Sequence, residues 1–233
     1  MIRHGDPDYT NDTLTEKGRR EAVALAKFLR DMPVKEFYCS PLGRARDTAA
    51  PTLSVTGRRA QILDWLREFP GYIIDRETGK GRIPWDLIPE EWTKMPLMYD
   101  KDKWYDAEIF SGGDVKEVYL HVCSELDGFL ADHGYVRDGA CYKAVIPNHD
   151  TIVFFCHFGI QCVILSHLLG ISAEVLWHGT ICTPTGITVV TTEEHVEGMA
   201  YFRCNHFGET AHLYMDSQLP SYSGRFRETR DDE

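Results

Sequence analysis

The amino end of the chain carries an arginine, a histidine and a glycine in succession, Arg3, His4 and Gly5. A neutral imidazole can attack phosphorus, a guanidinium can hold phosphoryl oxygens bidentately, and a glycine lets the backbone approach an anion. We therefore take His4 as the candidate nucleophile and Arg3 as a candidate phosphate ligand. The triplet alone is a weak signal, because a lone histidine is usually structural.

A second histidine and a second arginine follow later apolar segments. His157 comes directly after the apolar run at residues 151–156, which is typical of a buried parallel strand. Arg44, with Arg46 as a rival, comes shortly after an aromatic strand expected over residues 36–39. Ligands of open α/β sheets bind beyond the carboxyl ends of the strands, so these side chains should meet. Two arginines and two histidines together predict a site for a dianionic phosphoryl group.

A carboxylic acid follows the strand expected at residues 60–63, so it should lie at the same edge of the sheet as the histidines and arginines. Glu68 lies between Trp65 and Phe69 in the sequence. Apolar surroundings can keep a carboxyl group protonated near neutral pH, which is what a general acid needs. Glu68 is therefore the candidate acid, and Asp64 and Asp6 are nearby carboxylates that could serve instead.

Helical and strand patterns alternate over most of the chain. We expect helices near residues 16–31, 42–53, 112–134 and 160–169, and strands near 36–39, 60–63, 151–156, 186–191 and 199–204. This alternation predicts the α/β class, with a mostly parallel sheet in a three-layer α/β/α arrangement. Only Met1 and Ile2 precede Arg3, which leaves little room for a buried first strand, so we expect a few residues of that strand to lie upstream.

Residues 69–111 interrupt this alternation with four prolines and three tryptophans. Such a segment is too aromatic for a disordered linker and too irregular for a strand–helix unit. We therefore expect a single domain over residues 1–233, with an inserted cap at about 69–111. A polar tail is expected from about residue 221 to 233.

The composition limits the partners. A net charge of −11 argues against nucleic acid and anionic membranes as partners, because both are polyanionic. Seven widely spaced cysteines without a Cys-x-x-Cys pair suggest reduced thiols, and no apolar run is long enough to span a membrane. We expect a cytoplasmic protein. The sequence leaves open whether the chain forms a homodimer. A metal hydrolase is disfavoured, because the ten histidines show no His-x-His or His-Glu-x-x-His spacing.

Six segments in a fixed order carry the strongest signal. They are Arg3-His4-Gly5, Leu14-Thr15-Glu16-Lys17-Gly18, residues 40–49, Leu66-Arg67-Glu68, Cys156-His157-Phe158-Gly159, and Asn205-His206 with His212-Leu213. In this order they resemble the histidine phosphatase superfamily, which has the phosphoglycerate-mutase-like fold, in its branch of phosphatases. The resemblance spans about residues 2 to 213.

The resemblance implies roles for individual residues. His4 would become phosphorylated, and Glu68 would protonate the leaving oxygen and then activate water. The phosphoryl oxygens would be bound by Arg3, Arg44, His157 and Asn11, although the loop of residues 6–13 that carries Asn11 is shorter than is usual in the family. No metal and no other cofactor is implied.

The same resemblance distinguishes phosphatases from mutases. Related mutases follow the acid with a His-Tyr-Gly-type segment and carry an arginine pair in the cap. Here Phe69-Pro70-Gly71 follows Glu68, and the cap cations are scattered. The chain is therefore expected to be a histidine acid-type phosphatase, a phosphoric monoester hydrolase acting on a small phosphorylated metabolite. The alternatives are a phosphoglycerate-type mutase and a non-catalytic phospho-ligand binding module with the same fold.

Overall fold

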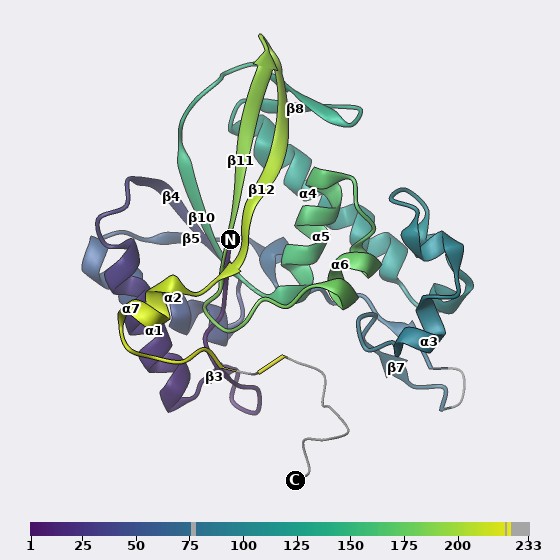
Figure 1. Cartoon of the computed structure of the whole chain (residues 1–233), viewed down its shortest axis with the longest axis horizontal. Coiled ribbons are helices and arrows are strands. Elements are labelled where there is room, and N and C mark those ends of the chain that lie inside the picture. Colours follow the sequence, from purple (N-terminus) through teal and green to yellow (C-terminus); the bar gives the residue numbers. More distant parts are fainter. Residues whose placement is uncertain (76–77, 222, 225–233) are drawn as a thin grey trace.

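A computed structural model describes residues 1–75, 78–221 and 223–224 of the chain. Eight strands form its central sheet: β1 (Ile2–Arg3), β4 (Val34–Cys39), β5 (Ala60–Ile62), β8 (Tyr135–Asp138), β9 (Cys141–Ala144), β10 (Thr151–Cys156), β11 (Ile187–Val196) and β12 (Met199–Glu209). Their order across the sheet is β5-β4-β10-β1-β11-β12-β9-β8 (Figure 1).

The sheet has a parallel half and an antiparallel half. Strands β5, β4, β10 and β1 run parallel, whereas β1–β11, β11–β12, β12–β9 and β9–β8 are antiparallel pairs. The parallel half contains β10, whose apolar run is covered on both faces, as buried parallel strands usually are. A mixed sheet between helical layers confirms the expected α/β class.

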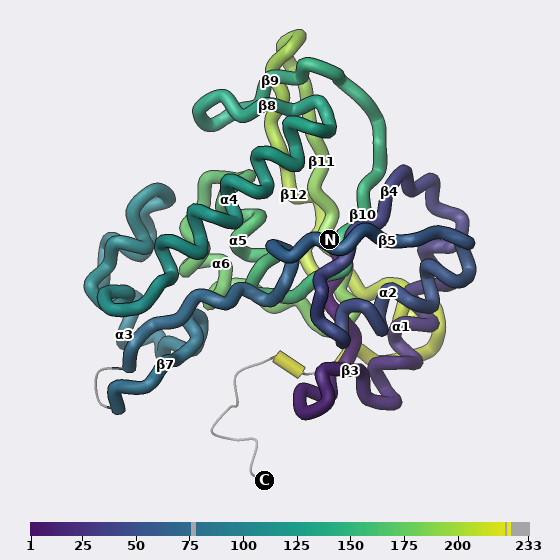
Figure 2. Tube along the Cα trace, turned by 180° about the vertical axis from the view of Figure 1, so that it is seen from behind, coloured from purple at the N-terminus to yellow at the C-terminus, as the bar shows by residue number. Residues whose placement is uncertain are grey.

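Helices cover both faces of the sheet (Figures 1 and 2). On one face lie α1 (Glu16–Leu29) and α2 (Gly43–Thr56), with α7 (Ala211–Met215) beside α1. On the other lie α4 (Val115–Asp132), α5 (Phe158–Leu169) and α6 (Ala173–Gly179). Each layer has its own apolar core, centred on Leu25 and Phe155 on the first face and on Phe154 and Ile164 on the second.

Local sequence explains where the helices begin and end. Thr15 caps α1, because its hydroxyl accepts a hydrogen bond from the Gly18 amide (3.1 Å). Helix α2 ends at Gly57, whose φ of 65° is left-handed and costs a glycine little. Helix α5 begins directly after His157, so the turn from β10 into α5 presents this histidine at the sheet edge.

The segment at residues 69–111 is folded into short elements. They are β6 (Ile73–Ile74), β7 (Gly81–Arg82), α3 (Pro89–Trp92) and the 3-10 turns η2 (Pro96–Tyr99), η3 (Trp104–Asp106) and η4 (Glu108–Phe110). Trp104 is fully buried, with its ring against Tyr119 and Trp177 of the main layers (centroids 5.1 and 5.3 Å away). The segment is therefore packed onto the helical layer, and its treatment as a separate cap stays a prediction.

Other expectations concern the termini and the thiols. Residues 222 and 225–233 of the expected tail lie outside the described residues. All seven cysteines are free. Within the described ranges, no helix combines the length and apolar character needed to cross a membrane.

Candidate active site

The carboxyl ends of β1 and β10 bring the two predicted histidines together. The strands are parallel neighbours, with Arg3 opposite Cys156, so His4 and His157 leave the sheet side by side. Their ring centroids are 5.2 Å apart, and both residues are almost completely buried. The chain segments around residues 4 and 157 therefore form one site.

Both predicted arginines act on this pair. Burial lowers the pKa of His4 and of His157, and positive charge on Arg3 and Arg44 lowers both further. Arg3 Nη1 donates to the carbonyl oxygens of Cys182 (2.6 Å) and Ser223 (3.2 Å). The rival Arg46 is exposed, whereas only 12% of the Arg44 side chain is exposed.

The hydrogen bond of His4 selects its tautomer. His4 Nδ1 lies 2.8 Å from the carbonyl oxygen of Gly5, which can only accept, so Nδ1 carries the proton and Nε2 carries the free lone pair. Burial lowers the pKa of His4 well below its usual value, and the charge of Arg3 lowers it further. The imidazole is therefore neutral near pH 7, as a nucleophile must be.

His157 is held by a serine. Its Nε2 lies 2.7 Å from Ser40 Oγ, which also accepts a hydrogen bond from the Leu42 amide (3.2 Å). The hydroxyl proton of Ser40 is thus available for Nε2, which leaves the ring proton on Nδ1. Nδ1 is buried and has no partner among the described residues. Burial is the main cause that holds the pKa of His157 well below its usual value, and the charges of Arg44 and Arg3 lower it further.

Asp12 positions Arg44. Its Oδ1 pairs with Arg44 Nη1 (2.6 Å), and its Oδ2 accepts from the Gly43 amide (2.6 Å) at the start of α2. The φ of Asp12 is 48°, a left-handed conformation that aspartate tolerates better than most residues. The Arg44 guanidinium also lies over the ring of Tyr9, 5.4 Å from its centroid.

Glu68 lies where the acid was expected. Its Oε1 accepts hydrogen bonds from the amides of Phe69 (3.0 Å) and Ile160 (3.2 Å). Burial raises the pKa of Glu68, against the opposing effect of these amides and both arginines. A Cβ at Gly159 would stand 2.7 Å from both Glu68 Oε1 and the Trp85 ring, so only glycine lets the three approach.

The rival carboxylates have other partners. Asp64 is exposed and pairs with Arg67 (2.9 Å), and Asp6 accepts from the hydroxyls of Thr15 (2.7 Å) and Ser221 (2.6 Å). These contacts leave Glu68 as the carboxyl group whose pKa is affected by both site arginines.

Asn11 is placed differently from the other predicted residues. It is exposed, and its side-chain amide donates to Asp8 Oδ2 (2.8 Å) on the same loop. The structure thus brings together Arg3, His4, Arg44, Glu68 and His157, while a contact from Asn11 to phosphate stays a prediction.

Sequence reasoning missed three supporting residues. Ser40 lay inside a quoted motif, but its bond to His157 depends on β4 and β10 being neighbours. Asp12 and Tyr9 lie in a loop without a periodic pattern, and their contacts with Arg44 join segments about thirty residues apart.

Three buried donors in the site have no partner in the described part of the chain: Arg3 Nε, Arg44 Nε and His157 Nδ1. An unsatisfied buried donor costs about 1–3 kcal/mol, and a bound ligand is one way to satisfy it. Three of them near a pair of imidazoles are suited to a tetrahedral anion with several oxygens. The described residues contain no group of three or more His, Cys, Asp or Glu side chains that could hold a metal ion.

Comparison with known proteins agrees with this geometry. Residues 1–81 match the family model of the histidine phosphatase superfamily (branch 1). That match includes Arg3, His4, Arg44 and Glu68. The first third of the chain is thus similar to the histidine phosphatase superfamily.

Two curated proteins are similar to this chain in sequence. The chain is 27% identical over 187 residues to an adenosylcobalamin/alpha-ribazole phosphatase of Salmonella typhi, covering 76% of this chain and 82% of the relative. It is 42% identical over 59 residues to a 2,3-bisphosphoglycerate-dependent phosphoglycerate mutase of Thermoplasma acidophilum, covering 21% and 30% of the two chains. Both relatives act on phosphorylated compounds by name.

A solved structure supports the fold. A phosphoserine phosphatase of Entamoeba histolytica, in complex with phosphoserine, superposes with a TM-score of 0.60 at 19% identity, over 91% of this chain and 96% of that one. The agreement in fold extends beyond residues 1–81, the segment that matches the family model.

Proposed function

We propose that the protein is a metal-independent phosphomonoester hydrolase that works through a phosphohistidine on His4 and acts on a small phosphorylated metabolite. The observation that carries this proposal is the pairing of two buried imidazoles, 5.2 Å apart, under the charge of two arginines. Positive charge around the equatorial oxygens is the main requirement of a loose phosphoryl-transfer transition state.

In the first step the neutral His4 attacks. Its Nε2 lone pair forms a bond to phosphorus, while the bond from phosphorus to the leaving oxygen breaks and its electron pair goes to that oxygen. Arg3, Arg44 and the Nδ1–H of His157 hold the three remaining oxygens. Glu68 gives its proton to the leaving oxygen, so an alcohol departs; burial favours the protonated form of Glu68 by raising its pKa.

In the second step the same groups act on water. Glu68, now a carboxylate, removes a proton from a water molecule whose oxygen attacks the phosphohistidine. The nitrogen–phosphorus bond breaks, its electron pair returns to His4 Nε2, and inorganic phosphate leaves. The site returns to its starting protonation state without a metal ion.

Hydrolysis is favoured over mutase activity by the cap cations. Arg82 Nη2 pairs with Glu91 (2.9 Å), and Arg82 Nη1 lies 3.7 Å from Asp75. Lys94 and Lys101 pair with Glu90 (2.7 Å) and Asp102 (2.5 Å). A mutase must bind a second anionic group, and here these cations are already paired with the cap's own acids.

Among the three cap tryptophans, Trp85 is the one beside the acid. Trp104 is buried in the core, and Trp92 stacks on His178 (5.2 Å). The Trp85 ring approaches Gly159 next to Glu68, where the leaving group must depart. This position supports a monoester whose leaving group has an apolar or aromatic part.

The assay that tests this function uses p-nitrophenyl phosphate in excess EDTA. We expect phosphate release that EDTA does not affect and that vanadate inhibits. Parallel incubation with 3-phosphoglycerate should release phosphate or leave the compound unchanged. Isomerisation to 2-phosphoglycerate would favour the mutase, and binding of vanadate without turnover of any monoester would favour a non-catalytic binding module.

A further inference from the structure

A buried glutamate on α1 lies beside the chain segment that follows His4. Glu21 is fully buried, and its Oε2 accepts a hydrogen bond from the Asp6 amide (2.8 Å). Its Oε1 is also buried and has no hydrogen-bond partner in the described part of the chain. Burying a carboxyl group costs free energy unless hydrogen bonds compensate. The bond to the Asp6 amide is therefore the contact through which Glu21 acts on its surroundings.

That amide and the Gly5 carbonyl belong to one peptide group. The Gly5 oxygen accepts a hydrogen bond from His4 Nδ1 (2.8 Å). Resonance gives the peptide bond partial double-bond character, so a negative group bound at the N–H end increases the negative charge on the oxygen at the other end. Glu21, the Gly5–Asp6 peptide group and His4 thus form one chain of two hydrogen bonds.

Two glycines allow α1 to approach this segment closely. A Cβ at Gly18 would stand 2.2 Å from the Asp6 carbonyl oxygen, and a Cβ at Gly5 would stand 2.8 Å from the Gly18 carbonyl oxygen. Gly18 and Glu21 are three residues apart on α1, so they lie on the same face of the helix. The close contact at Gly18 therefore brings the Glu21 carboxyl group within reach of the Asp6 amide.

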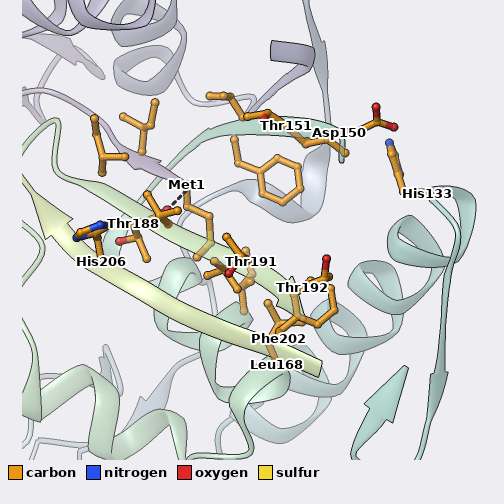
Figure 3. Close-up of a pocket in the computed structure, with 18 of the residues that line it drawn as sticks. Met1, His133, Asp150, Thr151, Leu168, Thr188, Thr191, Thr192, Phe202 and His206 are labelled. Carbon is orange, nitrogen blue, oxygen red and sulfur yellow. Dashed lines mark hydrogen bonds between the residues drawn. The ribbon is translucent and has the colours of Figure 1, made fainter. Parts of the chain in front are cut away.

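The backbone on either side of β1 is also fixed. The His4 amide donates to the Cys156 carbonyl (3.0 Å), and the His4 carbonyl accepts from the Thr185 amide (3.1 Å). On the other side of β1, the Met1 amino group donates to the Thr188 carbonyl (2.8 Å), and the Thr188 amide donates to the Met1 carbonyl (2.8 Å) (Figure 3). The backbone that carries His4 is thus preorganised, and the ring keeps its bond to the Gly5 oxygen while charge develops on it.

The attack on phosphorus makes the His4 ring positive. When Nε2 bonds to phosphorus, the ring acquires the charge of an imidazolium, which burial and the charges of Arg3 and Arg44 disfavour. The bond to the Gly5 carbonyl acts in the opposite direction and raises the pKa of His4. An ionised Glu21 strengthens that bond through the peptide group, because linked hydrogen bonds polarise one another.

We propose that Glu21 is a positioning residue for His4, which acts through the Gly5–Asp6 peptide group to orient the imidazole and to stabilise the positive charge that the ring gains during attack. The inference rests on the proposed phosphohistidine mechanism. It adds to that mechanism a carboxylate that touches neither the substrate nor the reacting atoms. The carboxylate offsets part of the repulsion between the charged ring and the two arginines.

The charge on Glu21 depends on the groups that face it. Burial raises its pKa, the bond from the Asp6 amide opposes this, and the negative charge of Asp6 raises the pKa further, whereas the charges of Lys17 and Arg3 lower it. The net effect is a raised pKa. Glu21 is ionised above this pKa, so its effect on His4 is lost as pH falls through it. The rate of His4 phosphorylation should fall over the same pH range.

The first experiment compares Glu21→Gln with the parent. Glutamine keeps an oxygen that can accept from the Asp6 amide but removes the charge. Single-turnover rapid quench with p-nitrophenyl phosphate measures the rate at which His4 is phosphorylated. We expect this rate to be about tenfold lower in Glu21→Gln, with the inhibition constant of inorganic phosphate unchanged. Glu16→Gln, on the exposed side of α1, is the matched control and should behave as the parent.

The second experiment observes the hydrogen bond itself and requires no turnover. The proton NMR resonance of His4 Nδ1–H lies further downfield when the bond to the Gly5 oxygen is stronger. We expect it to move upfield in Glu21→Gln and, in the parent, as pH falls through the pKa of Glu21. The titration should persist in Asp6→Asn and disappear in Glu21→Gln, which separates the two carboxyl groups. Because the parent is titrated directly, the test stands even where Glu21→Gln folds poorly.

Three results would overturn the proposal. The first is a phosphorylation rate and a resonance that are both unchanged in Glu21→Gln. The second is a lower rate with an unmoved resonance, because the effect would then not pass through His4 Nδ1–H. The third is a rate that falls only in proportion to phosphate affinity, which would indicate a damaged pocket. A parent that forms no phosphohistidine would refute the proposed function instead, and the resonance would still decide whether Glu21 acts on His4.

Discussion

Ser40 Oγ lies 2.7 Å from His157 Nε2, and both residues are completely buried. The contact joins the end of β4 to the end of β10, so it exists only because these strands are neighbours in the sheet. When the Ser40 hydroxyl donates to Nε2, the ring proton of His157 is on Nδ1. Nδ1–H has no partner among the described residues and is free to donate to a phosphoryl oxygen. Ser40 is thus a positioning residue for His157, the histidine that we propose binds phosphate.

Replacing Ser40 by alanine should lower kcat/KM about tenfold, which corresponds to about 1.4 kcal/mol of lost transition-state stabilisation. The cause is that His157 loses the bond that selects its tautomer. Steady-state kinetics on p-nitrophenyl phosphate measure the effect, and the exposed Ser54→Ala is the control. Unchanged kinetics in Ser40→Ala would show that His157 needs no such partner.

Replacing Asp12 by asparagine should weaken substrate binding. The neutral amide keeps an acceptor for the Gly43 amide but loses the charge that holds Arg44. We expect KM and the inhibition constant of inorganic phosphate to rise together, by roughly tenfold. The exposed Asp31→Asn provides the control. A fall in kcat at constant phosphate affinity would contradict a role for Asp12 in phosphate binding.

Replacing Glu68 by glutamine tests the acid. The loss of kcat should be about 100-fold or more for an alkyl phosphate, whose leaving oxygen needs a proton, and much smaller for p-nitrophenyl phosphate. Because the pKa of Glu68 is raised, its protonated form persists to higher pH, and alkyl phosphate turnover should fall as pH rises through that pKa. This alkaline decline should be absent in Glu68→Gln. Equal losses on both substrates would exclude the acid role.

His212 should make stability depend on pH. It is 2% exposed and bonded to Thr185 Oγ1 (3.0 Å), and burial lowers its pKa to about 4. Between about pH 6.5 and pH 4 the unfolded chain binds the proton and the folded chain does not, so stability falls as pH falls. The interval corresponds to about 3 kcal/mol.

The measurement for His212 is urea unfolding at several pH values. His212→Gln should be less stable than the parent at pH 7, and the difference between the two should shrink toward pH 4. The exposed His121→Gln should follow the parent throughout. A constant difference between His212→Gln and the parent would show that the histidine does not titrate in this range.

The sequence predicts the parts of the fold that have strong periodicity. The apolar run at 151–156 and the amphipathic helix over Glu16–Leu29 are both present, and the residues that follow the strands form the site. Strands β8 and β9 were not predicted, because Arg137 and Asp138 interrupt any apolar alternation. Helix α6 was also missed, since seven residues are too few for a periodic pattern.

The candidate site also has residues that the sequence predicts and residues that it does not. His4, Arg44 and His157 could be named because each stands at a characteristic place after a strand. The roles of Ser40 and Asp12 follow from contacts between distant segments, which no local pattern contains. Trp85 was named with two other tryptophans, and only the packing against Gly159 separates it from them.

The most direct test of the mechanism is to find the phosphoryl group. The protein is mixed with substrate, quenched in alkali within its first turnovers, digested, and analysed by mass spectrometry for the peptide that contains His4. We predict a phosphoryl group on His4, and a His4→Ala variant that neither carries the label nor turns over substrate. A label on another residue, or sustained turnover by His4→Ala, would contradict the account.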